Sequence, residues 1–176
     1  MRRYMRIQSF SLRCISARRF LLCRGSTNLV FTIAMKHSGS IRHLSTRLYC
    51  ATINSMYGTY AEALKELNYV ISLHPQRVTL ARALKQRAWL QATCPNPAFR
   101  NGQQAIKDAK AACSIAEWRD ENTIDTLAAA YAETGDFDWA VRYAAQALAV
   151  KGITPVDQKH IRRHLTLFQQ HQPVRL

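Results

Sequence analysis

Glycine and proline are scarce in this sequence, with 6 Gly and 5 Pro among 176 residues. Good helix formers such as Ala, Leu, Gln, Arg and Lys are abundant instead. Apolar residues make up 48% of the chain, which is enough for a hydrophobic core. The composition therefore predicts an all-α fold, and the length suits one domain with a tail.

Long apolar runs are also missing. A helix that crosses a bilayer needs roughly 18 consecutive apolar residues, and no run of that length occurs. The longest candidate, residues 28–35, is far too short to cross a membrane. The sequence therefore predicts no transmembrane segment.

Acidic residues are absent from the first third of the chain, although the formal net charge is +14. Glu62 is the first acidic residue, and ten Lys or Arg residues precede it. From Glu62 onward there are fifteen basic and eleven acidic residues, a net charge of +4. The excess charge belongs to the N-terminal segment, and a module with a charge of +4 needs no polyanionic partner to explain it.

Residues 1–43 form a basic segment that is rich in Arg and Ser and contains no Asp or Glu. Three interpretations stay open. In the first, the segment is disordered or belongs to an over-extended gene start, and the true start is an internal Met such as Met35. In the second, it is a targeting segment similar to an organellar transit peptide. In the third, it is a basic arm that binds nucleic acid or an anionic surface. A secretory signal fits less well, because its apolar stretch follows an over-long basic lead.

Cysteine pairs of the C-x-x-C type are missing, and the number of cysteines is odd. This pattern argues against a disulfide framework and against a structural zinc site. It favours buried or unused thiols in a reducing compartment. The five cysteines are Cys14, Cys23, Cys50, Cys94 and Cys113.

Motifs for catalysis, metal binding and nucleotide binding are absent as well. Cys94 has no His base, acid or second Cys near it in the sequence, so it is a weak candidate nucleophile. His160 and His164 have the i, i+4 spacing of zinc ligands, but Ile161 stands where H-E-x-x-H requires Glu. Both histidines are expected on a solvated face. We expect no catalytic residue, no metal, no cofactor and no enzymatic activity.

A repeated pattern of small and apolar residues runs through the rest of the chain. Two segments share the pattern Gly-x-aromatic-x-x-Ala, where x is any residue. Small or apolar residues follow four and seven positions after this Ala. The middle copy keeps only the last three positions, 35 residues before their equivalents in the final copy. The three sets are Gly58, Tyr60, Ala63, Leu67, Val70; Ala105, Ala109, Ala112; and Gly135, Phe137, Ala140, Ala144, Ala147.

Spacings of three, four and seven residues place side chains on one helical face. A Gly after one helix and an aromatic residue before the next suit a tight helical hairpin, and Pro75 ends a helix. Partner helices are predicted over residues 44–56, 79–93 and 122–134. A final helix over residues 156–171, with Thr154 as N-cap and Pro155 as first residue, would cap the last repeat. The pattern predicts an α-solenoid of about three hairpins over residues 44–176.

These residues resemble the tetratricopeptide repeat (TPR) consensus. The resemblance rests on Leu127, Ala128, Tyr131, Gly135, Phe137, Ala140, Ala144 and Ala147. The more specific phrases are R-A-W-L-Q-A-T-C-P-N-P at 87–97, R-N-G at 100–102 and D-T-L-A-A-A-Y-A-E at 125–133. They are similar to a repeat subfamily of planctomycete-type bacteria with A-W-L-L-A-T-C-P-D-P, R-[DN]-G and D-T-L-A-A-A-Y-A-E. A bacterial origin implies a cytoplasmic protein and favours an over-extended start or an export segment over a transit peptide.

The resemblance implies a non-catalytic scaffold or adaptor whose inner helices line a groove for a partner peptide or protein; self-association is an alternative. Arg82 and Gln86 would bind a peptide backbone, and Asp125 and Glu133 would favour basic partner residues. Trp89 is expected to pack against the loop at 94–102. The paired Lys and Asn of the carboxylate-clamp subtype are missing, so an acidic C-terminal tail is not the expected ligand. The implied groove residues are Arg82, Gln86, Trp89, Asn122, Asp125, Ala129 and Glu133.

The two binding hypotheses predict different results for a truncated chain. If the basic arm binds nucleic acid, the affinity for DNA or RNA falls steeply with salt, and removal of residues 1–43 abolishes that binding. If the groove binds a protein, partner binding survives the same truncation. Affinities measured at two salt concentrations for the full and the truncated chain distinguish these outcomes.

Overall fold

The computed structural model describes residues 41–176. The chain divides into two units between His43 and Leu44, and we call the second of them, residues 44–176, the helical unit. Residues 1–40 lie outside the described residues, and with them nearly all of the basic segment. The interpretations of that segment as a disordered or mis-called start, a targeting segment or a basic arm therefore stay predictions.

Every regular element of residues 41–176 is a helix, which confirms the all-α prediction for this part of the chain. The predicted helix at residues 44–56 is present, and the predicted boundaries of the other helices agree to within about two residues. Among these helices, none is both long enough and apolar enough to cross a bilayer. The elements are α3 (Ile41–Met56), α4 (Tyr60–Ser72), α5 (Arg77–Thr93), the 3-10 turn η2 (Pro97–Phe99), α6 (Gly102–Ile115), α7 (Glu121–Glu133), α8 (Phe137–Leu148) and α9 (Pro155–Gln169).

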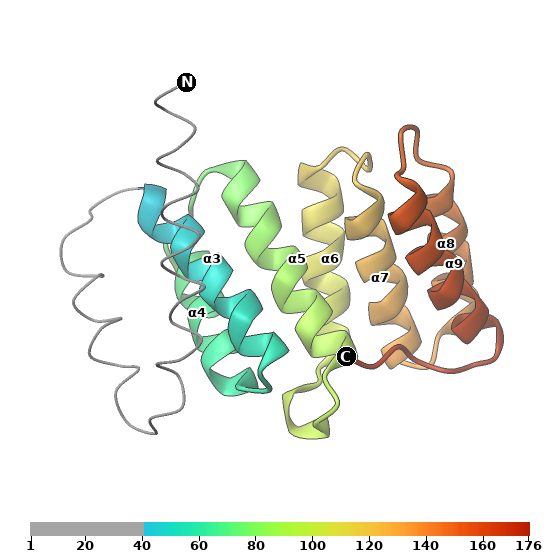
Figure 1. The fold of residues 1–176 in the computed structure, drawn as a ribbon, viewed down its shortest axis with the longest axis horizontal. Coiled ribbons are helices and arrows are strands. Elements are labelled where there is room, and N and C mark those ends of the chain that lie inside the picture. Colours follow the sequence, from blue (N-terminus) through green and yellow to red (C-terminus); the bar gives the residue numbers. More distant parts are fainter. Residues whose placement is uncertain (1–40) are drawn as a thin grey trace. The chain divides into compact units, whose positions relative to one another are not determined.

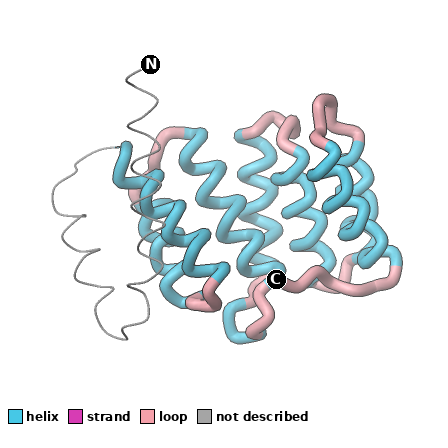
Figure 2. Tube along the Cα trace, in the orientation of Figure 1, coloured by secondary structure: helices cyan, strands magenta, loops and turns pink. Residues whose placement is uncertain are grey.

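Short connections join the helices, and they alternate between the two ends of the helices (Figure 2). Helices α3, α5, α7 and α9 therefore run in one direction, and α4, α6 and α8 run in the other (Figure 1). From α4 onward each helix packs against its neighbour in the chain, and α7 also packs against α5 and α9. This alternation brings side chains from α3, α5, α7 and α9 to a common face.

The pair α7–α8 shows how the small residues of the repeat bring two helices together. Ala140, Ala144 and Ala147 of α8 are completely buried, in the same apolar cluster as Ala128 of α7. Small side chains allow two helix backbones to approach closely. Gly135 forms the turn at φ +83°, a left-handed conformation that glycine adopts without steric cost. The predicted alanine stripe is confirmed.

The N-terminal helices bury larger residues. Leu48 and Ala51 of α3 pack with Leu67 and Val70 of α4 and with Ala83 of α5. The equivalent set in α6, Ala105, Ala109 and Ala112, is also fully buried. All three predicted stripes therefore face the interior of the helical unit.

Helix α9 begins as the sequence predicted. The hydroxyl of Thr154 accepts a hydrogen bond from the backbone N–H of Asp157 at 3.1 Å, and Pro155 is the first helical residue. Ile161 and Phe168 are buried in the cluster that includes α7 and α8. The helix thus covers apolar surface that α8 and α7 would otherwise expose.

The C-terminal residues return to α5, which no periodic pattern in the sequence indicated. The backbone N–H of Leu176 donates to the carbonyl of Thr93 at 3.0 Å, and Arg175 Nη1 donates to the carbonyl of Ala92 at 3.1 Å. Val174 is buried between these contacts and the main cluster. These bonds satisfy carbonyls in the last turn of α5, which have no partner within the helix.

The R-N-G phrase joins the loop after α5 to α6 and α7. Arg100 Nε lies 3.1 Å from Glu133 Oε1 of α7. The Asn101 side chain accepts a hydrogen bond from the N–H of Gln104 at 3.0 Å and caps α6. Asn101 is the N-cap of α6 and Gly102 is its first residue, because the Asn amide oxygen satisfies an unpaired N–H of the first turn.

Gly102 is required at that position by its contact with the end of α7. A Cβ atom added to Gly102 would lie 2.6 Å from Cγ2 of Thr134, far inside van der Waals contact. We expect Gly102→Ala to destabilise the protein by about 1–3 kcal/mol through overpacking, although Ala is the better helix former. Urea unfolding followed by circular dichroism measures the change.

The double variant Gly102→Ala with Thr134→Ser tests the cause. Serine lacks the Cγ2 methyl but keeps a hydroxyl for the bond that Thr134 donates to the Tyr131 carbonyl. Most of the lost stability should return in the double variant. A Gly102→Ala protein that is as stable as the parent would show that α6 and α7 do not approach closely enough to require glycine.

Candidate functional site

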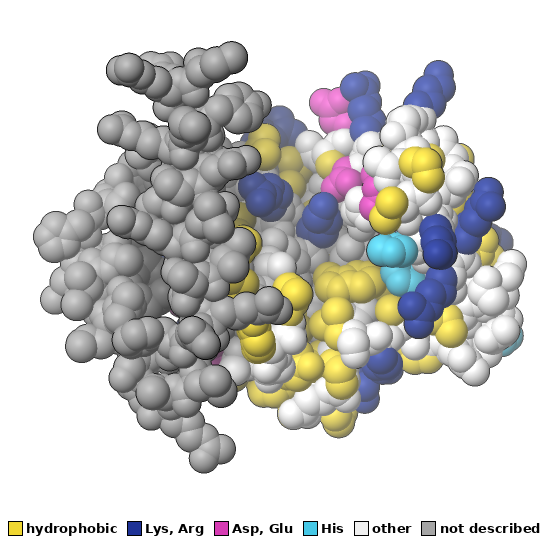
Figure 3. All heavy atoms as spheres, viewed as in Figure 1, with side chains coloured by type: hydrophobic (Ala, Val, Ile, Leu, Met, Phe, Trp, Pro, Cys, Tyr) yellow, Lys and Arg dark blue, Asp and Glu magenta, His cyan; other side chains and the backbone are white. Residues whose placement is uncertain are grey.

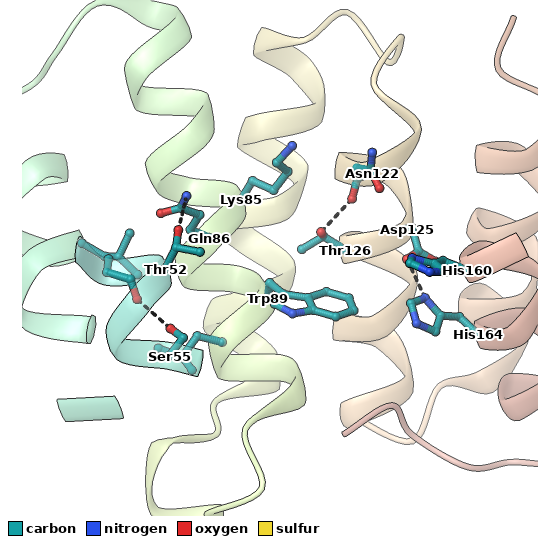
Figure 4. Close-up of a pocket in the computed structure, with 13 residues that line it drawn as sticks. Thr52, Ser55, Lys85, Gln86, Trp89, Asn122, Asp125, Thr126, His160 and His164 are labelled. Atoms are coloured by element: carbon teal, nitrogen blue, oxygen red, sulfur yellow. Dashed lines mark hydrogen bonds and ion pairs between the residues drawn. The ribbon is translucent and has the colours of Figure 1, made fainter. Parts of the chain in front are cut away.

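A cavity of about 300 Å³ opens on the face formed by the four parallel helices (Figure 4). We call it the groove. Its residues come from successive turns of each helix, because spacings of three and four residues keep side chains on one face. They are Ala51, Thr52 and Ser55 of α3, Leu67 of α4, Lys85, Gln86, Trp89 and Leu90 of α5, Asn122, Asp125 and Thr126 of α7, and His160 and His164 of α9.

Trp89 lies at the centre of the groove (Figure 4). Its indole ring is half-buried against the main apolar cluster, and its centroid lies 5.7 Å from that of the His164 ring. The sequence predicted that Trp89 packs against the loop at 94–102. Leu90 of α5 packs against this loop instead, in one apolar cluster with Cys94 and Phe99 of the loop. The Phe99 ring lies 5.9 Å from the Tyr60 ring of α4.

Asp125 and His164 join α7 to α9 at one side of the groove. His164 Nδ1 lies 2.7 Å from Asp125 Oδ2, and Asp125 is only 4% exposed. The prediction that both histidines lie on a solvated face holds for His160, which is exposed, and is wrong for His164. Burial of Asp125 makes the difference, since a buried carboxylate needs a partner. Within residues 41–176 no group of three potential metal ligands occurs.

Gln86 forms the opposite side of the groove. Its Nε2 donates to Thr52 Oγ1 at 3.1 Å and so joins α5 to α3. The hydroxyl of Thr52 donates to the carbonyl of Leu48, and the hydroxyl of Ser55 donates to that of Ala51. The side chains of Gln86, Thr52 and Ser55 therefore stabilise the groove wall through these hydrogen bonds. They are not arranged as partners in a reaction.

The Asp125–His164 pair has the form of the acid and base in a hydrolytic triad. A triad also needs a hydroxyl or thiol that bonds to the imidazole. The third hydroxyl of the groove, on Thr126, donates to the carbonyl of Asn122 at 2.8 Å. The hydroxyls that line the groove are thus bonded to carbonyls of their own helices and not to the His164 imidazole.

Lys85 lies at the edge of the groove and is paired with Asp120 before α7, with Nζ 3.0 Å from Oδ2. Burial alone would raise the pKa of Asp120. The hydrogen bond from Thr123 and the Lys85 charge outweigh burial and lower that pKa below its usual value. Asp120 is therefore ionised at neutral pH and compensates the Lys85 charge locally.

Four of the seven residues that the sequence assigned to a groove line this cavity: Gln86, Trp89, Asn122 and Asp125. The other three are not among its lining residues. Arg82 is exposed one turn before Gln86, and Ala129 is buried within the helix layers. Glu133 forms ion pairs with Arg100, at 3.1 Å, and with Arg175, at 2.7 Å, so its charge is compensated within the chain.

Sequence reasoning missed several lining residues, notably Thr52, Lys85 and His164. The i, i+4 spacing of His160 and His164 was a usable signal, because it places both side chains on one face of α9. The sequence did not indicate which helix this face of α9 packs against, because only tertiary packing brings α7 and α9 together.

Comparisons with protein-family models, with curated proteins and with solved structures gave no match. The resemblance to tetratricopeptide repeats therefore stays a prediction that rests on the motifs.

Two cysteines of the helical unit are buried free thiols, Cys94 and Cys113. Burial raises the pKa of the Cys113 thiol to about 12, and burial also raises the pKa of Cys94. A raised pKa leaves little thiolate at neutral pH, and the thiolate is the reactive form. Neither thiol is set up as a nucleophile.

We expect Cys94 and Cys113 to resist alkylation in the native protein. At pH 8, iodoacetamide should modify them about a hundredfold more slowly than in urea, because both access and thiolate fraction are reduced. Mass spectrometry of the tryptic peptides after timed labelling measures the rates, with the urea-unfolded chain as the reference. Similar rates in both states would mean that these thiols are not buried.

Proposed function

We propose that residues 44–176 form a TPR-like α-solenoid that binds a peptide of a partner protein in the groove. In this proposal α3–α4, α5–α6 and α7–α8 are the three hairpins and α9 is the cap. The module acts as a non-catalytic scaffold or adaptor in the bacterial cytoplasm. The motif resemblance and the alternating direction of the helices support this assignment.

The observation that carries the proposal is that side chains of α3, α5, α7 and α9 line one cavity. A groove between helices that presents an aromatic floor and a few polar groups suits an extended or helical peptide. Figure 3 shows histidine side chains beside an apolar surface on this face, with basic side chains near them. Volumes near 300 Å³ are at the small end of ligand pockets, so the cavity suits one side chain of a longer peptide.

The expected affinity follows from the size of the groove. A short groove orders few peptide residues, and the entropy of ordering a flexible peptide offsets much of the contact energy. We therefore expect dissociation constants in the micromolar range. Such binding suits reversible assembly, and a second copy of the chain is an alternative occupant.

Asn122→Trp tests the groove directly. Asn122 is exposed at the groove, so a larger ring there should obstruct the cavity without disturbing the core. Twelve-residue peptides are first selected from a random display library on the immobilised full chain. We expect Asn122→Trp to weaken their binding by about tenfold or more, as measured by fluorescence anisotropy.

Ala111→Trp is the matched control, because Ala111 is exposed on α6 and does not line the groove. It adds the same ring and should leave the affinity unchanged. Equal affinities of the selected peptides for both variants and the parent would contradict the proposal, since the peptides would then bind elsewhere.

A further inference from the structure

Two buried acceptor atoms at the groove have no hydrogen-bond donor within residues 41–176. They are Oε1 of Gln86 and Oδ1 of Asp125, on side chains that both line the cavity. A buried acceptor without a donor costs free energy, and more so when it is charged. Asp125 is 4% exposed, so little bulk water reaches it.

Several of the groove's own donors are committed elsewhere. Gln86 Nε2 donates to Thr52, and the hydroxyls of Thr52, Ser55 and Thr126 donate to backbone carbonyls. Lys85 is paired with Asp120. These donors leave Asp125 Oδ1 unpaired within residues 41–176, and a ligand in the groove can supply the missing hydrogen bond.

The indole of Trp89 lies between these two side chains, with Gln86 on one side and Asp125 on the other (Figure 4). An aromatic face attracts a cation. A guanidinium group is planar, stacks on aromatic rings and carries five N–H donors in a fork that suits carboxylate and amide oxygens. A lysine ammonium offers three donors from one point and cannot stack flat.

We propose that the groove binds an arginine side chain of the partner peptide. The guanidinium stacks on Trp89 and donates to Asp125 Oδ1, while Gln86 lies on the other side of the ring. This inference rests on the proposed peptide-binding function and names its ligand chemistry.

The charges that face the groove agree with a cationic ligand. Asp120 compensates Lys85, and Asp125 contacts His164 through Oδ2, which leaves Oδ1 outside that contact. His160 is exposed to solvent, which screens its charge. An acidic side chain would find no uncommitted donor among the hydroxyl, amide and ammonium groups of Thr52, Ser55, Thr126, Gln86 and Lys85.

The first experiment uses Trp89 as its own reporter. The chain has three Trp residues, and Trp118 and Trp139 stack against Tyr143 outside the groove. In the full chain with both changed to Phe, fluorescence reports Trp89 alone. The probes are N-acetyl-arginine amide, N-acetyl-lysine amide and N-acetyl-norleucine amide, titrated at pH 7.

We expect the arginine probe to bind about tenfold more tightly than the norleucine probe, because charge-assisted hydrogen bonds are the strong ones. The lysine probe should fall between them. Equal affinities for the arginine and norleucine probes would overturn the inference.

Two variants test the charge at the groove, and a third is the control. Asp125→Asn removes the charge with little change of shape and should weaken the arginine probe about tenfold. Gln86→Glu adds a charged acceptor and should strengthen it, an effect that misfolding cannot mimic. Asp138→Asn is the control, because Asp138 is exposed on α8 away from the groove. An Asp125→Asn protein that keeps both its circular dichroism spectrum and its affinity for the arginine probe would refute the inference.

Peptides selected from the display library separate this inference from the proposed function. Selected peptides that lose binding on Asn122→Trp and on Arg→norleucine in the peptide support both. Peptides that lose binding on Asn122→Trp but tolerate Arg→norleucine overturn the arginine assignment and leave the groove function intact. Peptides that are insensitive to Asn122→Trp overturn the function itself.

Discussion

The burial of α7 is the constraint on which the rest of the helical unit depends. All residues from 123 to 130 are buried, because α7 packs against α5, α6, α8 and α9. A helix can be enclosed on all sides only if it is apolar or small around its whole circumference, and the three successive alanines from Ala128 to Ala130 meet this requirement. The same small side chains set how closely α8 and α9 approach α7.

Because α7 is enclosed by other helices, its polar residues need hydrogen-bond partners within the protein. Thr123 bonds to Asp120, Thr126 donates to the carbonyl of Asn122, and Asp125 bonds to His164. Only Oδ2 of Asp125 is used in this way, and Oδ1 is left without a hydrogen-bond donor among residues 41–176. The arginine proposal is thus a consequence of packing: the interior of α7 supplies a carboxylate, and α9 positions it.

Ion pairs between segments that lie apart in the sequence occupy several charged residues of the motif phrases. Arg87 of α5 makes a bidentate pair with Asp108 of α6 at 2.6 and 2.9 Å, the strongest geometry available to these groups. Arg100 and Arg175 both pair with Glu133. Several charged residues of the motif are therefore occupied inside the protein, and motif residues and groove-lining residues overlap only in part, at Trp89, Leu90, Asp125 and Thr126.

The sequence alone determined the local structure: the helices, the alanine stripes and the caps at Thr154 and Gly135 follow from spacing and from the backbone preferences of single residues, which act over one or two turns. Tertiary packing decided the site. Whether Trp89 faces the loop or the groove depends on how α5 is rotated against α7. Whether Glu133 is a surface charge or part of an ion pair depends on Arg100 and Arg175, which the fold brings to it. Residues 39 positions apart, such as Asp125 and His164, form a bond that no local pattern encodes, because only the stacking of α7 on α9 brings them within reach.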